Sequence, residues 1–222
     1  MKIIKIDLEN FSREEVGMVA EEILQGKVVV LPTDTVYGLS AIVTSKKAIK
    51  KIYRIKKRTS GQRFGDRREK KLNEDQKHLI LLVKSFCMVR RYCFLSKKQY
   101  DYLKEWWLDG KRALTVVLRG RRNYFLEKEI DLPELLSEDG GVAVRRPNNK
   151  FLLELIKMVD EPIVSTSLNI TGQPELKDVS LVGEYFQNVK PEVVVDAGLL
   201  PKQKTSRVED LMDMKNIKVY RE

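Results

Sequence analysis

The sequence predicts an α/β protein of the α+β type, in which an open, twisted, mixed β-sheet is flanked by helices. Segments with helical and with strand-like apolar spacing alternate along most of the 222 residues, and the late part is rich in strands. Several connections are short enough for hairpins, so parallel and antiparallel pairs should both occur. No linker divides the chain, and we expect one domain over residues 1–222.

The N-terminal part begins with a clearly marked helix. Ser12 and Glu15 have the spacing of a capping box, and Gly26 stands where a helix commonly ends. Five apolar residues between these signals share one helical face: Val16, Val19, Ala20, Ile23 and Leu24. A buried strand over residues 28–31 follows, and a second helix over residues 46–57 ends in a basic cluster.

The rest of the chain continues the alternation after one interruption. Residues 59–77 carry few apolar side chains and many charges, so we expect a charged insert there. Further helices are expected to begin at Ser96, Asn149 and Asp178. The later strands are predicted over residues 78–83, 113–119, 141–145, 162–166, 192–196, 205–211 and 217–221.

Composition excludes several classes of protein. The chain is 42% hydrophobic and 33% charged, which is typical of a soluble globular protein. It has no apolar run near 18 residues and no signal-peptide pattern, so we expect no membrane contact and a cytoplasmic location. Cys87, Cys93 and His78 are too few and too scattered for a disulfide framework, and no metal site built from cysteine or histidine is expected.

The formal net charge of +10 has two interpretations. It can reflect a lysine-rich proteome, or it can indicate an anionic partner such as a nucleotide or RNA. Charge alone does not decide between them.

Polar side chains follow three predicted strands at the point where each strand ends. Thr33, Asp34 and Thr35 follow the first buried strand, Arg145 follows residues 142–144, and a serine- and asparagine-rich stretch begins at Ser165. In open sheets flanked by helices, ligands bind beyond strand ends. Each group alone can instead cap a turn or contact solvent, but together they can converge on one polar ligand.

Two common nucleotide motifs are missing. The chain has no GxxxxGK[ST] phosphate loop and no GxGxxG after a strand. It also offers no Ser/His/Asp set for covalent catalysis. A site of hydroxyls, amides and cations favours binding and charge stabilisation, as in phosphoryl or nucleotidyl transfer.

Seven stretches, in order, resemble the motifs of the YrdC-like family, the threonylcarbamoyl-AMP synthases. Together they extend over nearly the whole chain, which makes the resemblance specific. They are LPTDTVYGLSA (31–41), IKKR (55–58), ALTVVL (113–118), VAVRRP (142–147), STSLNITG (165–172), TSRVEDL (205–211) and the terminal VYRE (219–222).

The resemblance implies a YrdC-like fold with a basic concave face and a definite reaction. The family joins L-threonine, bicarbonate or CO2, and ATP into threonylcarbamoyl-AMP, and pyrophosphate is released. Other proteins transfer the threonylcarbamoyl group to the adenosine beside the tRNA anticodon. We therefore expect Mg²⁺ with ATP as cofactor, small-molecule substrates, downstream tRNA threonylcarbamoyl-transfer proteins as partners, and a contact with tRNA or double-stranded RNA.

The resemblance also assigns residues to the two substrates. Threonine is expected to contact Thr35, Arg145 and Ser206. ATP is expected to contact Lys56, Arg58, Ser165, Ser167, Asn169 and Arg221. Further candidates at the site are Thr33, Thr115 and Thr171.

The sequence departs from the family at several motif positions, and these changes leave open a slow or altered enzyme. The departures are Lys111-Arg112-Ala113 in place of P-G-P, Gly141 and Arg207 in place of threonines, Leu168 in place of alanine, and His78 in place of proline. The insert is either a tolerated surface loop or a basic lid or RNA contact.

Two alternatives come from other functional classes. The first is an RNA-binding or ribosome-assembly factor on the same scaffold with weak or no synthase activity, suggested by the net charge and the altered P-G-P segment. The second is a carbamoyl-transfer module of hydrogenase maturation, but the chain lacks the zinc-finger cysteines of such proteins.

Overall fold

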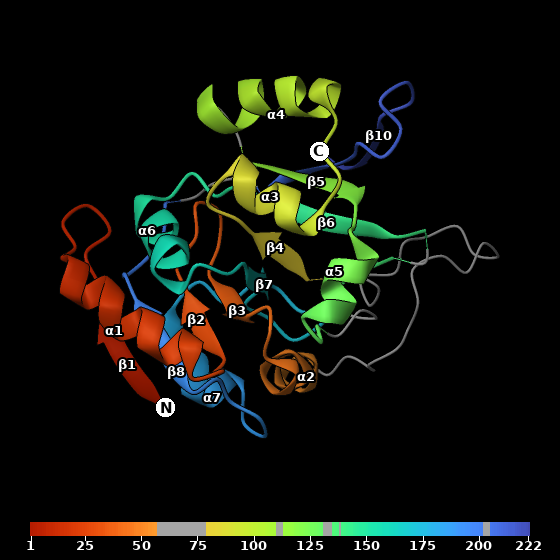
Figure 1. The fold of residues 1–222 in the computed structure, drawn as a ribbon. Coiled ribbons are helices and arrows are strands. Elements are labelled where there is room, and N and C mark those ends of the chain that lie inside the picture. Colours follow the sequence, from red (N-terminus) through yellow and green to blue (C-terminus); the bar gives the residue numbers. More distant parts are fainter. Residues whose placement is uncertain (57–78, 110–112, 131–134, 138, 202–204) are drawn as a thin grey trace.

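A computed structural model describes residues 1–56, 79–109, 113–130, 135–137, 139–201 and 205–222, and its strands join into a ten-stranded mixed sheet (Figure 1). The strand order is β1-β8-β2-β3-β7-β4-β6-β5-β9-β10. The strands are β1 Lys2–Lys5, β2 Val29–Leu31, β3 Gly38–Ile42, β4 Ile80–Leu82, β5 Leu114–Arg119, β6 Gly141–Arg145, β7 Ile163–Ser167, β8 Val193–Asp196, β9 Arg207–Asp210 and β10 Lys218–Arg221.

Parallel and antiparallel pairs are mixed in this sheet, which confirms the predicted fold class. β8 lies parallel to both β1 and β2, and the pairs β4–β6 and β5–β9 are also parallel. The antiparallel pairs are β2–β3, β3–β7, β4–β7, β5–β6 and β9–β10. Neighbours in the sheet are therefore often distant in the sequence.

Three helices begin directly after predicted capping residues, at Ser12, Ser96 and Asn149. The Ser12 hydroxyl accepts a hydrogen bond from the Glu15 backbone N–H, and the Glu15 carboxylate accepts one from Ser12 N–H. Leu24 is an exception to the predicted buried face, because it ends the helix and is 54% exposed. The helices are α1 Arg13–Leu24, α2 Lys46–Ile55, α3 Phe86–Tyr92, α4 Lys97–Asp109, α5 Arg122–Glu127, α6 Lys150–Val159, the 3₁₀ helix η2 Val179–Leu181 and α7 Val182–Tyr185.

The two faces of the central strands have different surroundings. Leu81, Val144, Val116 and Val164 occupy neighbouring positions on one face and are almost completely buried. α1, α3 and α6 lie on the near side of the sheet in Figure 1, and α1 packs against α6. On the opposite face Val117 and Ala143 are only partly buried, whereas Thr115 and Arg145 of the same strands are buried. One face of the sheet is thus open to a ligand.

Several predicted features lie outside the described residues: Arg58, the insert at 59–77, His78, Lys111 and Arg112. Within the described ranges, no helix has both the length and the apolar character that crossing a membrane requires.

Candidate functional site

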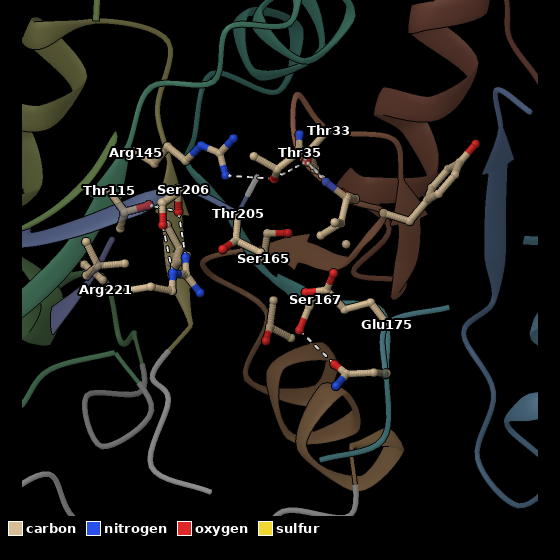
Figure 2. Close-up of a pocket in the computed structure, with 18 of the residues that line it drawn as sticks. Thr33, Thr35, Thr115, Arg145, Ser165, Ser167, Glu175, Thr205, Ser206 and Arg221 are labelled. Carbon is tan, nitrogen blue, oxygen red and sulfur yellow. Dashed lines mark hydrogen bonds between the residues drawn. The ribbon is translucent and has the colours of Figure 1, made fainter. Parts of the chain in front are cut away.

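A cavity of about 680 Å³ lies against the open face of the sheet (Figure 2). Its floor follows the two-residue period of β-strands, since side chains two apart point to the same face. Pairs with this spacing come from β4, β5, β6 and β7: Ile80 and Leu82, Thr115 and Val117, Ala143 and Arg145, Ser165 and Ser167. The β2–β3 turn, the segment after β7, and β9 and β10 complete the walls.

Arg145 is held firmly at one side of the cavity. It is 5% exposed, its Nη1 donates to Thr35 Oγ1 at 3.2 Å, and its Nη2 forms an ion pair with Asp34. The second oxygen of the Asp34 carboxylate accepts the backbone N–H of Asn148 at 3.0 Å. Such charge-assisted bonds fix a planar guanidinium in one orientation. The next residue, Arg146, is not among the lining residues and donates to backbone carbonyls.

Thr33 organises the turn that presents Thr35 to the cavity. Its hydroxyl accepts the backbone N–H of Thr35 at 3.1 Å and that of Val36 at 3.2 Å, and it donates to the Val36 carbonyl at 2.7 Å. Hydroxyl bonds of this kind stabilise a turn locally. The structure therefore gives Thr33 a turn-forming role and leaves Thr35 in contact with Arg145.

Arg221 lies at a second wall in a network of neutral groups (Figure 2). Its Nε donates to the Ser206 carbonyl and its Nη2 to Ser206 Oγ, both at 2.8 Å. The hydroxyls of Ser206 and Thr115 are 2.9 Å apart. Burial lowers the pKa of Arg221, the positive charge of Arg145 lowers it further, and Glu175 opposes both effects. The two guanidiniums thus repel each other across a cavity that favours anions.

Gly38 of β3 leaves room for the side chain of Ser165 on the neighbouring strand β7. The Ser40 hydroxyl donates to Ser165 Oγ at 3.0 Å, and these two residues are register partners. A Cβ atom on Gly38 would lie 2.4 Å from Ser165 Oγ. Glycine at this position therefore allows Ser165 to occupy the cavity floor.

The segment after β7 is fastened by a buried lysine. Lys56 is 0% exposed, and its ammonium donates to the Ser167 carbonyl at 2.7 Å and to Asn169 Oδ1 at 2.6 Å. Ser167 Oγ also donates to Asn169 Oδ1, and Asn169 Nδ2 donates to the Gln173 carbonyl at 2.6 Å. Lys56 is not among the cavity-lining residues, so it supports the segment from behind.

Nearly all the site residues suggested by the resemblance meet at this cavity. Ten line it: Thr33, Thr35, Thr115, Arg145, Ser165, Ser167, Asn169, Thr171, Ser206 and Arg221. Lys56 lies behind the wall, and Arg58 is outside the described residues.

Other lining residues were not among the predicted site residues: Gln173, Glu175, Thr205 and Tyr220. Thr205 and Tyr220 directly precede the motif residues Ser206 and Arg221. Their place next to these residues was the sequence feature that could have identified them as lining residues. Nothing in the sequence indicates the direction of the Glu175 side chain. Asp34 was visible in the first motif, but its partner Arg145 is 111 residues away.

Three residues that depart from the family pattern, Leu168, Gly141 and Arg207, fit their surroundings in the structure. Leu168 is 0% exposed and packs in the core, where its longer side chain faces away from solvent. A Cβ atom on Gly141 would lie 2.6 Å from the Val117 side chain, so glycine fits the close packing there. Arg207 forms ion pairs with Glu209 and Glu222.

The arrangement is suited to binding anions. Among the described lining residues, the charged side chains are Arg145, Arg221 and Glu175. In the same part of the chain, the lining has no cysteine or histidine that would serve as a nucleophile or base. The described residues also contain no group of three or more His, Cys, Asp and Glu side chains placed to hold a metal ion.

Comparison with known proteins identifies the family. The Sua5/YciO/YrdC family model, described as "Telomere recombination", matches residues 21–65 and 67–222. The threonylcarbamoyl-AMP synthase of Pyrococcus abyssi is 29% identical over 201 residues, which cover 89% of this chain and 51% of that protein. That of Klebsiella pneumoniae is 25% identical over 206 residues, which cover 91% of this chain and 94% of that protein.

Solved structures share the fold. Escherichia coli YciO superimposes with a TM-score of 0.76 at 23% identity, over 100% of this chain and 94% of that one. A Pyrococcus abyssi Sua5 structure complexed with L-threonine gives a TM-score of 0.74 at 27% identity, over 95% of this chain and 54% of that one. The chain thus spans about half the length of the Pyrococcus protein. With a family model that matches nearly every residue from 21 onward, the chain belongs to the Sua5/YciO/YrdC family.

Proposed function

We propose that this chain makes threonylcarbamoyl-AMP and pyrophosphate from L-threonine, bicarbonate or CO2, and ATP. The observation that carries the proposal is the meeting of two guanidiniums and a row of hydroxyls in one cavity of a Sua5/YciO/YrdC chain. The names of the relatives support this reaction. They do not support the alternative of an RNA-binding factor. Two HypF structures share the fold at 18% and 19% identity, which gives no support for hydrogenase maturation.

Threonine is assigned to the Arg145 side of the cavity. A zwitterionic amino acid needs a cation for its carboxylate, and Arg145 is oriented by Asp34 and Thr35. The Thr35 hydroxyl can also accept or donate to the substrate. Ser206, between Thr115 and Arg221, completes the proposed threonine contacts.

ATP is assigned to the side formed by Arg221 and the segment after β7. Ser165, Ser167 and Asn169 supply hydroxyl and amide groups there, and Lys56 holds Asn169 in place. Arg58 belongs to the proposed phosphate contacts by its motif position. Mg²⁺ bound with ATP would screen the phosphate charge, and a cation held mainly by phosphates would need no cage of protein ligands.

The chemistry requires positioning more than a strong base. The threonine amine combines with CO2 to form a carbamate, and a carbamate oxygen attacks the α-phosphorus of ATP as pyrophosphate leaves. Holding both substrates in one cavity supplies the proximity that this step needs. Arg221 is placed to stabilise negative charge that develops on the phosphate. A site that excludes water also protects the carbamate.

Substrate omission tests the proposed reaction. The protein should release pyrophosphate only when ATP, threonine and bicarbonate are all present. Turnover that does not depend on threonine would refute the assignment. We further propose that the product passes to tRNA threonylcarbamoyl-transfer proteins in the cytoplasm, and salt-dependent tRNA binding measures any direct RNA contact.

A further inference from the structure

Glu175 is a carboxylate in a cavity otherwise suited to anions. It is the acidic residue among the described side chains that line the cavity, alongside Arg145 and Arg221. Figure 2 shows its side chain pointing into the cavity in the region of Ser167, with Arg145 and Arg221 across from it. Neither the reaction scheme above nor the family motifs use this residue.

The backbone around Glu175 is anchored on both sides. The Leu176 N–H donates to the Leu168 carbonyl at 2.8 Å. On the other side, the Tyr185 hydroxyl donates to Gln173 Oε1 at 3.1 Å and to the Pro174 carbonyl at 3.4 Å. A side chain on a segment anchored in this way has a fixed point of origin, unlike a glutamate on a free loop.

The carboxylate itself is not committed to another protein group. Within the described residues, no hydrogen bond or ion pair is recorded for it, although its charge acts on Arg221 and opposes the lowering of the arginine pKa. Glu175 is partly buried, and within the described residues its carboxylate forms no ion pair. The carboxylate is therefore available to a ligand that enters the cavity.

ATP alone is the wrong ligand for a carboxylate. Glu175 belongs to the segment of Ser167 and Asn169, which is the side assigned to the nucleotide, and a triphosphate there would be repelled. A divalent cation between them converts the repulsion into attraction. Mg²⁺ is typically bound through one or two carboxylates together with substrate phosphates and several waters, and the cavity offers one such carboxylate.

We propose that Glu175 is the protein's ligand for the Mg²⁺ that accompanies ATP. This inference rests on the proposed function, since it requires ATP in the cavity. It deepens that function by making the magnesium complex, rather than free ATP, the form that the site selects. Glu175 could instead bind the ammonium group of threonine. In that case its loss would weaken the binding of threonine and not of ATP.

Calorimetric titration of E175Q with ATP, with and without Mg²⁺, tests the inference. In excess Mg²⁺ the variant should bind ATP about 10-fold more weakly than the wild type, because a metal contact is lost. In EDTA the order should reverse, with the variant binding ATP up to about fivefold more tightly, because a repulsive charge is gone. A reversal of this kind cannot come from a general loss of folding.

E184Q is the matched control, because it removes the same charge from an exposed residue in the same part of the chain. It should match the wild type in both titrations. Equal ATP affinities for E175Q and the wild type at every Mg²⁺ concentration would overturn the inference alone. A loss of threonine binding with unchanged ATP binding would assign Glu175 to the ammonium group instead. Absence of ATP binding by the wild type would refute the proposed function and this inference with it.

Discussion

The two arginines of the cavity have opposite electrostatic surroundings. Arg145 is almost completely buried and its charge is balanced by Asp34, whose side chain is 9% exposed. Arg221 donates its recorded hydrogen bonds to the carbonyl and hydroxyl of Ser206, which carry no charge. Its pKa is lowered by burial and by the charge of Arg145. Within the described residues, one guanidinium therefore has a carboxylate partner and the other has none.

This difference suggests how the cavity distinguishes its substrates. A balanced and rigid arginine suits a single carboxylate, which needs orientation more than charge. An arginine that lacks a counter-ion gains most from a highly charged ligand such as a triphosphate. The electrostatics thus agree with the assignment of threonine to Arg145 and of ATP to Arg221. Substitutions at the two arginines and around them test this difference.

Arg145→Ala should have the largest effect. Threonine affinity should fall on the order of 100-fold, because the carboxylate loses its cation, whereas ATP affinity should change much less. The substitution also leaves Asp34 buried without its partner, so the free energy of unfolding should fall by about 3 kcal/mol. Calorimetric titration with each substrate and chemical denaturation measure these effects.

A double variant separates binding from stability. Asp34→Asn combined with Arg145→Ala removes the unpaired charge and should recover part of the lost stability, without recovery of threonine binding. Equal losses of threonine and ATP affinity in Arg145→Ala would contradict the assigned role.

Arg221→Ala should weaken ATP binding more than threonine binding, and this loss should be smaller than the loss of threonine affinity in Arg145→Ala. We expect ATP affinity to fall roughly 10-fold, because a charge-assisted contact to phosphate is lost, and threonine affinity to change little. Stability should be nearly preserved, because no buried carboxylate is left without a partner among the described residues. Comparing this variant with Arg221→Lys shows whether the charge or the bonds to Ser206 matter more.

Asn169→Ala leaves both arginines in place and tests the support of the nucleotide side. It removes one acceptor of the buried Lys56 ammonium, which should lower the unfolding free energy by about 1–3 kcal/mol. ATP affinity and the rate of adenylate formation should fall severalfold, and Ser167→Ala should impair the same step. Wild-type rates of pyrophosphate release in both variants would place the nucleotide elsewhere.

Gly38→Ala should have the smallest effect on the difference between threonine and ATP binding. Its Cβ would lie 2.4 Å from Ser165 Oγ, so Ser165 must shift, at a cost of about 1–3 kcal/mol in stability. Gly38→Ala combined with Ser165→Ala relieves the contact and should recover stability, which thermal unfolding measures. A single variant as stable as the wild type would indicate that the strands separate without strain.

The sequence by itself determined the features that depend on local interactions. The capping pairs Ser12–Glu15 and Ser96–Gln99 form bonds across three residues, and both mark helix starts correctly. Apolar strands of four to seven residues and the ordered motifs were likewise readable, because side-chain alternation and turn residues act over short distances. These signals were sufficient for the fold class and for the polar strand ends, and the family resemblance supplied the other cavity residues.

Tertiary structure alone decided which of these residues meet. The short elements β1, β3, α3 and α5 were not predicted, because a helix of six or seven residues or a strand of four or five is stable only through its packing. Lys56 binds Asn169 across 113 residues and supports the cavity wall without lining the cavity, although its motif suggested a phosphate contact. Burial and long-range strand pairing determine where such a side chain lies. The strand order places segments side by side that are distant in the sequence, and no local sequence pattern predicts that order.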